Sequence, residues 1–166
     1  MSFSPVGAII NTMGKVVSVN ISEKKGTPKS PTDAIELAPD LGVKGDAHAG
    51  PGERQVSLLM EESIERAKKT MEKNKACDLV KEAVELVPGT FAENITTTGI
   101  DLLLLSRGDE LMAGSARLRI TKIGKDCHRK CSIYYKVGDC IMPAEGVFAE
   151  VVTGGTVMEG DEIEKC

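Results

Sequence analysis

Alternating apolar and polar residues predict a strand near the start of the chain. From Lys15 to Ile21, Val17, Val19 and Ile21 fall on one face, and this period of two is typical of β-structure. The residues before about Met13 show no periodicity, so we expect an N-terminal arm or extension over residues 1–13 and a single domain over residues 14–166. A loop rich in lysine, proline and glycine follows at residues 23–33, and a second short strand is predicted at residues 34–38.

The period changes to that of a helix after this β-rich start. Met60, Ile64, Ala67 and Met71 recur at spacings of four, three and four, which predicts an amphipathic helix. A weaker helical pattern over residues 78–87 ends at a Pro-Gly pair.

The second half of the chain reads mainly as β-structure. Apolar runs separated by glycine-containing turns predict strands over residues 102–105, 110–112, 117–123, 146–152 and 157–163. Short strands with one clear helix indicate a mainly β (α+β) fold, a closed or partly closed β-barrel with one or two helical insertions.

Composition and charge argue against nucleic acid and membrane as binding partners. A chain of 166 residues fits one domain, and 21 basic against 25 acidic residues give a net charge of -4, which does not favour nucleic acid. No apolar window is long enough to span a membrane, and no secretory signal pattern is present. Five cysteines, an odd number, suit a reducing compartment. We therefore expect a cytoplasmic protein that binds neither nucleic acid nor membrane.

Three of the cysteines are clustered, and two of them stand among cations. Cys127 and Cys131 lie close to a histidine and three basic residues, and nearby cations favour the reactive thiolate. If this segment formed a helical turn, the two sulfurs would share a face and could bind one metal or form a disulfide. A structural zinc site would need four ligands, for which Cys140, His128 and His48 are the other candidates, so zinc remains an alternative.

Two other segments have the polarity of a site. Asp46 and His48 lie two residues apart on a glycine-flanked loop, where both could point into one cleft. Glu93 and Asn94 interrupt a run of otherwise β-forming residues. A structural histidine and a turn capped by Asn94 are the alternatives, and these residues alone do not decide between them.

The order of several motifs along the chain resembles the MOSC domain family, which includes the C-terminal domain of molybdenum cofactor sulfurases and stand-alone bacterial relatives. The resemblance spans roughly residues 16–163 and rests on the following motifs: Lys-Lys-Gly-Thr-x-Lys at 24–29, Gly-x-x-Gly-Asp-x-His-x-Gly at 42–50, Arg-Gln-Val-Ser-Leu-Leu at 54–59, Phe-x-Glu-Asn-Ile at 91–95, Gly-Lys-x-Cys-His-x-x-Cys at 124–131 and Gly-Asp-Cys-x-Met-Pro-x-Glu-Gly at 138–146.

The resemblance implies a β-barrel whose cleft binds the molybdenum cofactor (molybdopterin) or a related sulfurated anion. Cys131 matches the family's cysteine and would carry sulfur or bind molybdenum through its thiolate, with Cys127 as an auxiliary thiol. Ala144 stands where close relatives often carry arginine, so another cation would have to compensate. The residues implied to contact or line the cofactor site are Lys25, Lys29, Asp46, His48, Arg54, Glu93, Asn94, His128, Arg129 and Lys130.

The same resemblance implies the reaction class and the partners. Stand-alone members of the family could be carriers, ligand-binding chaperones or enzymes; as an enzyme, the protein would be a sulfurtransferase or a reductase that depends on the molybdenum cofactor. Its partners would be molybdenum cofactor biosynthesis proteins, a separate pyridoxal-phosphate cysteine desulfurase and molybdoenzymes, with no pyridoxal-phosphate site expected in this chain. The alternatives are a structural zinc protein and a non-catalytic adaptor in cofactor biosynthesis.

Overall fold

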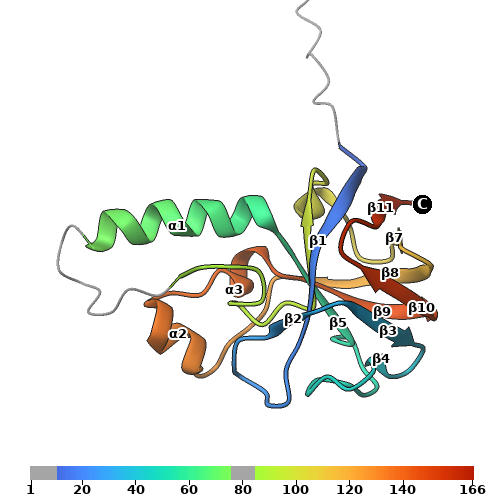
Figure 1. The fold of residues 1–166 in the computed structure, drawn as a ribbon, viewed down its shortest axis with the longest axis horizontal. Helices are drawn as coiled ribbons and strands as arrows, with labels where there is room; N and C mark the ends of the chain where they lie inside the picture. Colours follow the sequence, from blue (N-terminus) through green and yellow to red (C-terminus); the bar gives the residue numbers. More distant parts are fainter. Residues whose placement is uncertain (1–10, 76–84) are drawn as a thin grey trace, which may run out of the picture.

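A closed barrel of seven strands forms the body of the protein (Figure 1). The computed structural model describes residues 11–75 and 85–166. The strands follow each other around the barrel in the order β11 (Glu162–Lys165), β7 (Glu110–Ala113), β8 (Ala116–Ile123), β9 (Val147–Thr153), β5 (Val56–Met60), β6 (Ile95–Thr98) and β1 (Met13–Ile21). Pairing of β1 with β11, which sets Met13 opposite Glu164, closes the barrel. Neighbouring strands are antiparallel except for the parallel pair β5 and β6.

Smaller β elements extend this barrel. β2 (Ser30–Thr32) pairs with the end of β1, and β10 (Gly155–Met158), β3 (Ala34–Ala38) and β4 (Gly42–Val43) form a separate three-stranded sheet. The buried side of β3 presents Ile35 and Leu37 to the same apolar core as the barrel strands.

Fully buried aliphatic side chains fill the barrel. Leu58, Ile95, Leu118 and Val147 come from four different strands and are all inaccessible to solvent. The barrel interior is therefore a packed core and not a channel, so a binding site has to lie at its rim.

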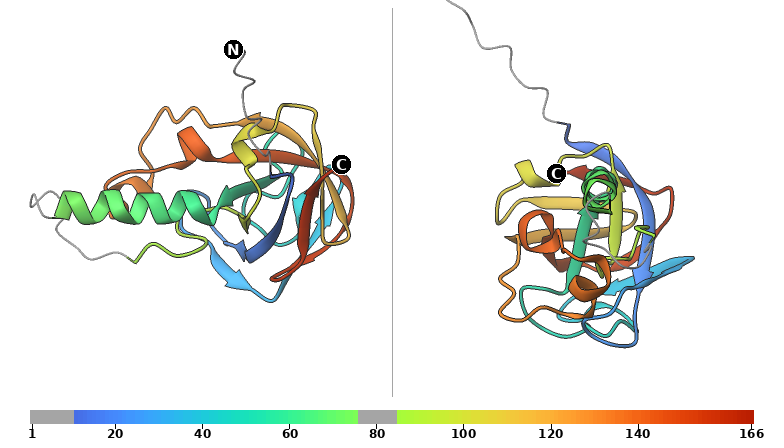
Figure 2. Two further views of the ribbon diagram at one scale, coloured as in Figure 1. Left: turned by 90° about the horizontal axis from the view of Figure 1, so that it is seen from above. Right: turned by 90° about the vertical axis from the view of Figure 1, so that its left-hand side faces the viewer.

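Three helices lie at one end of the barrel, within the part of the chain that the structure describes. α1 (Glu61–Lys75) follows β5 without a loop and projects beyond the barrel, while α2 (Ser132–Val137) and α3 (Met142–Glu145) lie beside it (Figures 1 and 2). A second apolar cluster contains Ile64 of α1, Ile133 of α2 and the buried ring of Phe91. The helical end is thus held to the barrel by its own small core.

The structure confirms the mainly β barrel and most of the predicted elements. Strands occupy the ranges predicted at 15–21, 34–38, 110–112, 117–123 and 146–152, and the helix expected from Met60 begins at Glu61. The helix predicted at 78–87 lies mostly outside the described residues, and residues 85–87 have no regular structure. The expected arm likewise lies largely outside them, with β1 beginning at Met13.

Several sequence predictions are wrong. Residues 102–104 form a 3-10 helix and not a strand, because the Asp101 side chain accepts a hydrogen bond from the Leu103 N–H and caps a turn. The strand predicted at 157–163 is two strands, separated by a turn at Gly160 with a positive φ of 88°. A bulge in β1 turns Val16 rather than Val17 toward the core. The sequence did not predict β4, β5, β6, α2 and α3, and β2 lies within the range predicted as a loop at 23–33.

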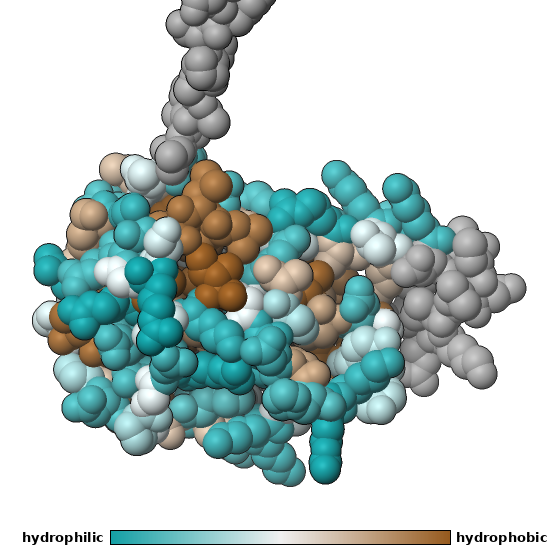
Figure 3. Space-filling view, turned by 180° about the vertical axis from the view of Figure 1, so that it is seen from behind, coloured by the Kyte–Doolittle hydropathy of each residue, from teal (hydrophilic) through white to brown (hydrophobic). Residues whose placement is uncertain are grey.

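The surface opposite to that of Figure 1 is mainly hydrophilic, with an extensive apolar patch and smaller apolar areas (Figure 3). Among the described residues, none of the helices is both long and apolar enough to cross a bilayer.

Candidate functional site

A pocket of about 180 Å³ lies where the barrel meets the segment that carries α2 and α3. Its polar wall contains His48, Arg54 and Lys125, and its thiols are Cys127, Cys131 and Cys140. The apolar part of the wall is made by Phe91, Ile133, Met142 and Phe148. The fold therefore brings together side chains from the loop after β4, the start of β5, strand β9 and the segment after β8.

The three thiols differ in exposure. Cys127 is exposed, whereas Cys131 and Cys140 are partly buried. Cys131 precedes α2 in an extended conformation, with φ -92° and ψ 178°, so the segment from Cys127 to Cys131 is not the helical turn considered above. Burial raises the pKa of Cys140, and the neighbouring Cys131 and Cys127 add to that effect. Cys140 is therefore suited to remain a neutral thiol.

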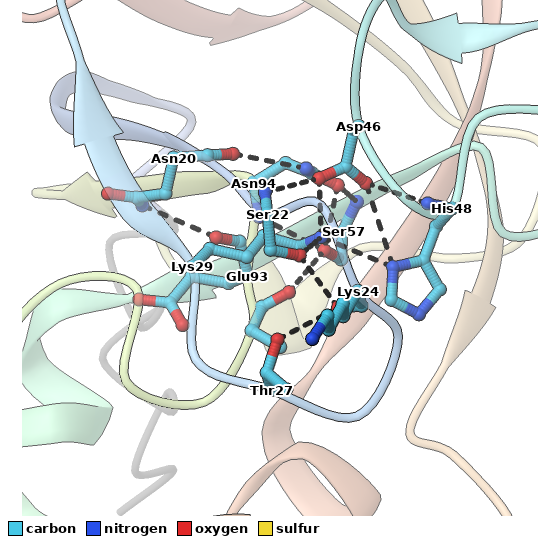
Figure 4. Close-up of polar contacts among 11 residues, drawn as sticks. Asn20, Ser22, Lys24, Thr27, Lys29, Asp46, His48, Ser57, Glu93 and Asn94 are labelled. Atoms are coloured by element: carbon cyan, nitrogen blue, oxygen red, sulfur yellow. Dashed lines mark hydrogen bonds and ion pairs between the residues drawn. The ribbon is translucent and has the colours of Figure 1, made fainter.

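Next to the pocket, the buried side chains of Lys29 and Asp46 form a polar cluster with the partly buried His48 (Figure 4). The Lys29 Nζ lies 2.6 Å from Asp46 Oδ1, 3.2 Å from Ser22 Oγ and 3.2 Å from His48 Nδ1. Asp46 Oδ1 also accepts the Ser22 N–H at 3.0 Å, and Asp46 Oδ2 accepts the His48 N–H at 3.1 Å. One carboxylate thus joins the end of β1 to the loop that carries His48.

Burial and charge pairing act in opposite directions within this cluster. Burial lowers the pKa of Lys29, and the hydrogen bond and charge of Asp46 oppose that effect. Burial by itself would raise the pKa of Asp46, but contacts with His48, Lys29 and the Ser22 N–H outweigh it and hold the pKa below its ordinary value. The pair is therefore a buried salt bridge, with both side chains 1% exposed.

A glycine allows the Lys29 segment to pack closely against the segment that follows α1. The Lys29 N–H donates to the Gly89 carbonyl at 2.8 Å, and a Cβ at Gly89 would overlap with the Lys29 carbonyl. Gly89 also has a positive φ of 89°, which other residues rarely adopt. This close approach holds the backbone of Lys29 against that of Gly89.

Asn94 lies in the pocket wall but is engaged in holding the barrel rim together. Its Oδ1 accepts from the Ser57 N–H at 3.1 Å and from Ser57 Oγ at 3.0 Å, and its Nδ2 donates to the Asn20 carbonyl at 3.2 Å. Asn94 thus links β1 to β5, which supports a structural role.

Glu93 is fully buried and does not line the pocket. Its Oε1 accepts from the Gly89 N–H at 2.6 Å and from Thr96 Oγ1 at 2.9 Å, whereas Oε2 has no hydrogen-bond partner among the described residues. Burial raises the pKa of Glu93, because the two hydrogen bonds at Oε1 do not replace the lost water. This carboxyl is therefore suited to be protonated in the folded protein.

The structure brings some of the predicted site residues together and separates others. Cys127, Cys131, His48, Arg54 and Asn94 line the pocket, and Lys29 and Asp46 lie behind His48. The residues that are exposed and absent from the pocket wall are Lys25, His128, Arg129 and Lys130.

Lys130 makes a contact away from the pocket, with its Nζ 4.1 Å from the centre of the Tyr134 ring. Among the described residues, no group of three or more His, Cys, Asp or Glu side chains is arranged to hold a metal ion.

The cofactor-site residues expected from the sequence did not include Lys125, Cys140, Ser57 or Phe148, although Cys140 was a candidate zinc ligand and Lys125 one of the cations near the thiols. Lys125 and Cys140 belong to the motifs described above, so those motifs were the available signal. The sequence contains no such signal for Phe148, which lies in a buried strand. In the structure, the Arg54 guanidinium lies 5.5 Å from the centre of the Phe148 ring. Phe148 thus helps to place a cation at the pocket.

Comparison with known proteins gives one family and several solved structures. The family model of the MOSC domain matches residues 44–164. The crystal structure of the YUAD protein from Bacillus subtilis superposes with a TM-score of 0.72 at 20% identity, covering 92% of this chain and 95% of that one. No curated protein sequence matches the chain.

Two further crystal structures share the fold. YiiM from Geobacillus stearothermophilus gives a TM-score of 0.68 at 16% identity, with 93% of this chain and 75% of that one covered. YiiM from Escherichia coli gives 0.62 at 19% identity, with 93% and 69% covered. At these identities the likeness concerns the fold alone.

Proposed function

The chain belongs to the MOSC domain family, and on that basis we propose that it binds the molybdenum cofactor, or a sulfurated intermediate of it, and carries sulfur on Cys131. The observation that carries the proposal is the grouping of a partly buried thiol with His48, Arg54 and Lys125 around one pocket. A sulfur-bearing anion needs a soft nucleophile together with hydrogen-bond donors and cations, and this wall supplies all of them.

The size of the pocket limits how much of the cofactor it would hold. Pockets that enclose a whole small molecule usually measure about 300–1,000 Å³, and this one measures about 180 Å³. The residues therefore fit the metal-bearing end of the cofactor, with the rest outside the pocket.

The residues that would hold this end follow from their chemistry. The Cys131 thiolate would bind molybdenum, since thiolates suit soft-tolerant metals. Arg54 and Lys125 would hold anionic groups through charge-assisted hydrogen bonds. When bound, the cofactor supplies the metal centre that accepts sulfur.

Loading of Cys131 with sulfur is a balanced exchange. The Cys131 thiolate forms a bond to the terminal sulfur of a donor persulfide, the sulfur–sulfur bond of the donor breaks, and the donor thiolate leaves. No external oxidant or reductant is required. The donor would be a separate pyridoxal-phosphate cysteine desulfurase, and the recipients would be cofactor biosynthesis proteins or molybdoenzymes.

Intact-mass analysis tests this role of Cys131. The reduced protein is incubated with a cysteine desulfurase and L-cysteine, and the gain of one sulfur atom is recorded. We expect Cys131→Ser to abolish the gain and Cys166→Ser, which changes an exposed thiol outside the pocket, to leave it unchanged. Continued loading of Cys131→Ser at the wild-type rate would refute the proposal.

Mass spectrometry of ligands retained after anaerobic purification tests cofactor binding. We expect a molybdopterin species in the wild type that is lost or diminished in Cys131→Ser. Absence of both a retained ligand and sulfur loading would favour the non-catalytic adaptor.

A further inference from the structure

We propose that Lys29 is a positioning residue that holds His48 in its neutral Nε2–H tautomer, so that the imidazole donates a hydrogen bond to an anionic group in the pocket. The tautomer follows from the protein alone, and only its use on a sulfur-bearing ligand rests on the function proposed above.

All three N–H donors of the Lys29 ammonium have an acceptor. A lysine ammonium has three N–H donors and no acceptor. Three atoms lie within hydrogen-bond distance of Nζ, namely Asp46 Oδ1 at 2.6 Å, Ser22 Oγ at 3.2 Å and His48 Nδ1 at 3.2 Å. The ammonium is therefore saturated, and His48 Nδ1 has to be the acceptor in its contact.

The competing partner of Nδ1 is Asp46, and the geometry excludes it. Asp46 Oδ2 lies 3.6 Å from His48 Nδ1, which is too long for a hydrogen bond. The same oxygen already accepts the backbone N–H of His48 at 3.1 Å. An Nδ1 that accepts from Lys29 leaves the ring proton on Nε2.

The position of the ring allows Nε2 to be used. The His48 side chain is 34% exposed and lines the pocket, whereas the side chains of Lys29 and Asp46 are 1% exposed. In Figure 4 the second ring nitrogen points away from Asp46 and Lys29. Lys29 therefore acts on the pocket through His48 and not by direct contact with a ligand.

This arrangement reverses the common use of a carboxylate beside a histidine. A carboxylate that accepts from Nδ1–H leaves a lone pair on Nε2, and the imidazole can then act as a base. Here the ammonium stands at Nδ1, so Nε2 presents a proton and binds acceptor oxygen or sulfur atoms. Positive charge at the pocket comes instead from Arg54 and Lys125.

Nitrogen-15 NMR of the imidazole rings tests the tautomer in the unaltered protein. The chain has two histidines, and His128→Gln, which changes an exposed residue outside the pocket, identifies the signals of His48. At neutral pH we expect Nε2 to carry the proton and Nδ1 to carry none. A proton on Nδ1 overturns the proposal whatever the variants do.

A second measurement tests the use of the donor. The alkylation rates of Cys131 by iodoacetate, an anion, and by iodoacetamide, its neutral analogue, are compared by peptide mass spectrometry. We expect the ratio of the two rates to fall about tenfold in His48→Leu and in Lys29→Met, the effect of losing one charge-assisted hydrogen bond. Lys44→Met, which removes an exposed cation outside the pocket, should keep the wild-type ratio.

The outcomes separate this proposal from the proposed function. If His48→Leu and Lys29→Met both keep the wild-type ratio, the proposed role of Lys29 is wrong. It is also wrong if Lys29→Met keeps the Nε2–H tautomer of His48. Failure of sulfur loading on Cys131 with the expected tautomer and rate ratios overturns the sulfur chemistry alone. If Lys29→Met does not fold, the NMR result on the wild type and the ratio in His48→Leu decide.

Discussion

Replacing Lys29 with methionine removes a buried ammonium and leaves the Asp46 carboxylate without its cation. Both side chains are 1% exposed and the two charged atoms are 2.6 Å apart, so water cannot take the place of the ammonium. Removing one partner of a buried pair generally costs about 3–5 kcal/mol. Asp46 would keep the N–H groups of Ser22 and His48, which places the expected loss near the lower end, about 3 kcal/mol.

Urea unfolding gives the free energy of each variant. The matched control is Lys44→Met, which breaks the exposed pair of Lys44 with Glu36 and should cost less than about 1 kcal/mol. The double variant Lys29→Met/Asp46→Leu should be more stable than Lys29→Met, because no uncompensated charge remains buried.

The stability that the Lys29–Asp46 pair contributes should also depend on pH. The pKa of Asp46 lies below its ordinary value of 3.8, so the stability from the paired carboxylate is present in full above pH 3.8 and is lost as the pH falls through the lower folded value. The wild type should therefore lose the stability that comes from this carboxylate only in strongly acidic solution. A loss in Lys29→Met no larger than in Lys44→Met would refute the account of a buried, interdependent pair.

Four further results are expected. Glu93→Gln should raise the Tm at pH 7.5, because the raised pKa of the wild-type carboxyl means that the folded state favours its protonated form. This advantage should be lost below about pH 4.5, and a pH-independent difference in Tm would contradict the explanation. Cys140 should alkylate more slowly than a free thiol until the pH exceeds the ordinary value of 9.0, and a free-thiol rate at pH 7.5 would be inconsistent with its burial. Cys131→Ser should leave the far-UV spectrum and Tm nearly unchanged, whereas collapse of the fold would favour structural zinc. Arg54→Ala should weaken cofactor binding about tenfold or more and reduce its dependence on salt, and an unchanged salt dependence would argue against a cationic rim.

The sequence predicts those elements of this fold whose burial follows a regular period. The alternation in residues 117–123 and the helical spacing after Met60 both reappear in the structure. β5 was missed because all five of its residues are buried, and a short continuous apolar run does not distinguish a strand from a helix. The bulge in β1 depends on pairing with β6, which lies far along the chain, so local alternation could not reveal it.

For the site, too, local motifs predict some of the residues, whereas contacts between distant positions cannot be predicted from them. The motifs around Cys131 and His48 identify residues that do meet at one pocket. Lys29, by contrast, stands in a loop of lysine, proline and glycine, where a charged side chain normally remains solvated. It is buried because Asp46, 17 residues away, supplies a partner, and that pairing exists only in the folded chain.

The seam between β1 and β11 has a consequence for the order of events during synthesis. Three residue pairs close the barrel, and they join Met13, Gly14 and Lys15 to residues 162–164. The ring of strands therefore cannot close until residues 162–164 have left the ribosome, and until then the first residues of β1 lack their partner on one edge. Contacts between positions this distant in sequence slow folding, and an open edge can pair with another chain. The nascent protein is thus most exposed to misassembly in the interval before β11 becomes available to β1.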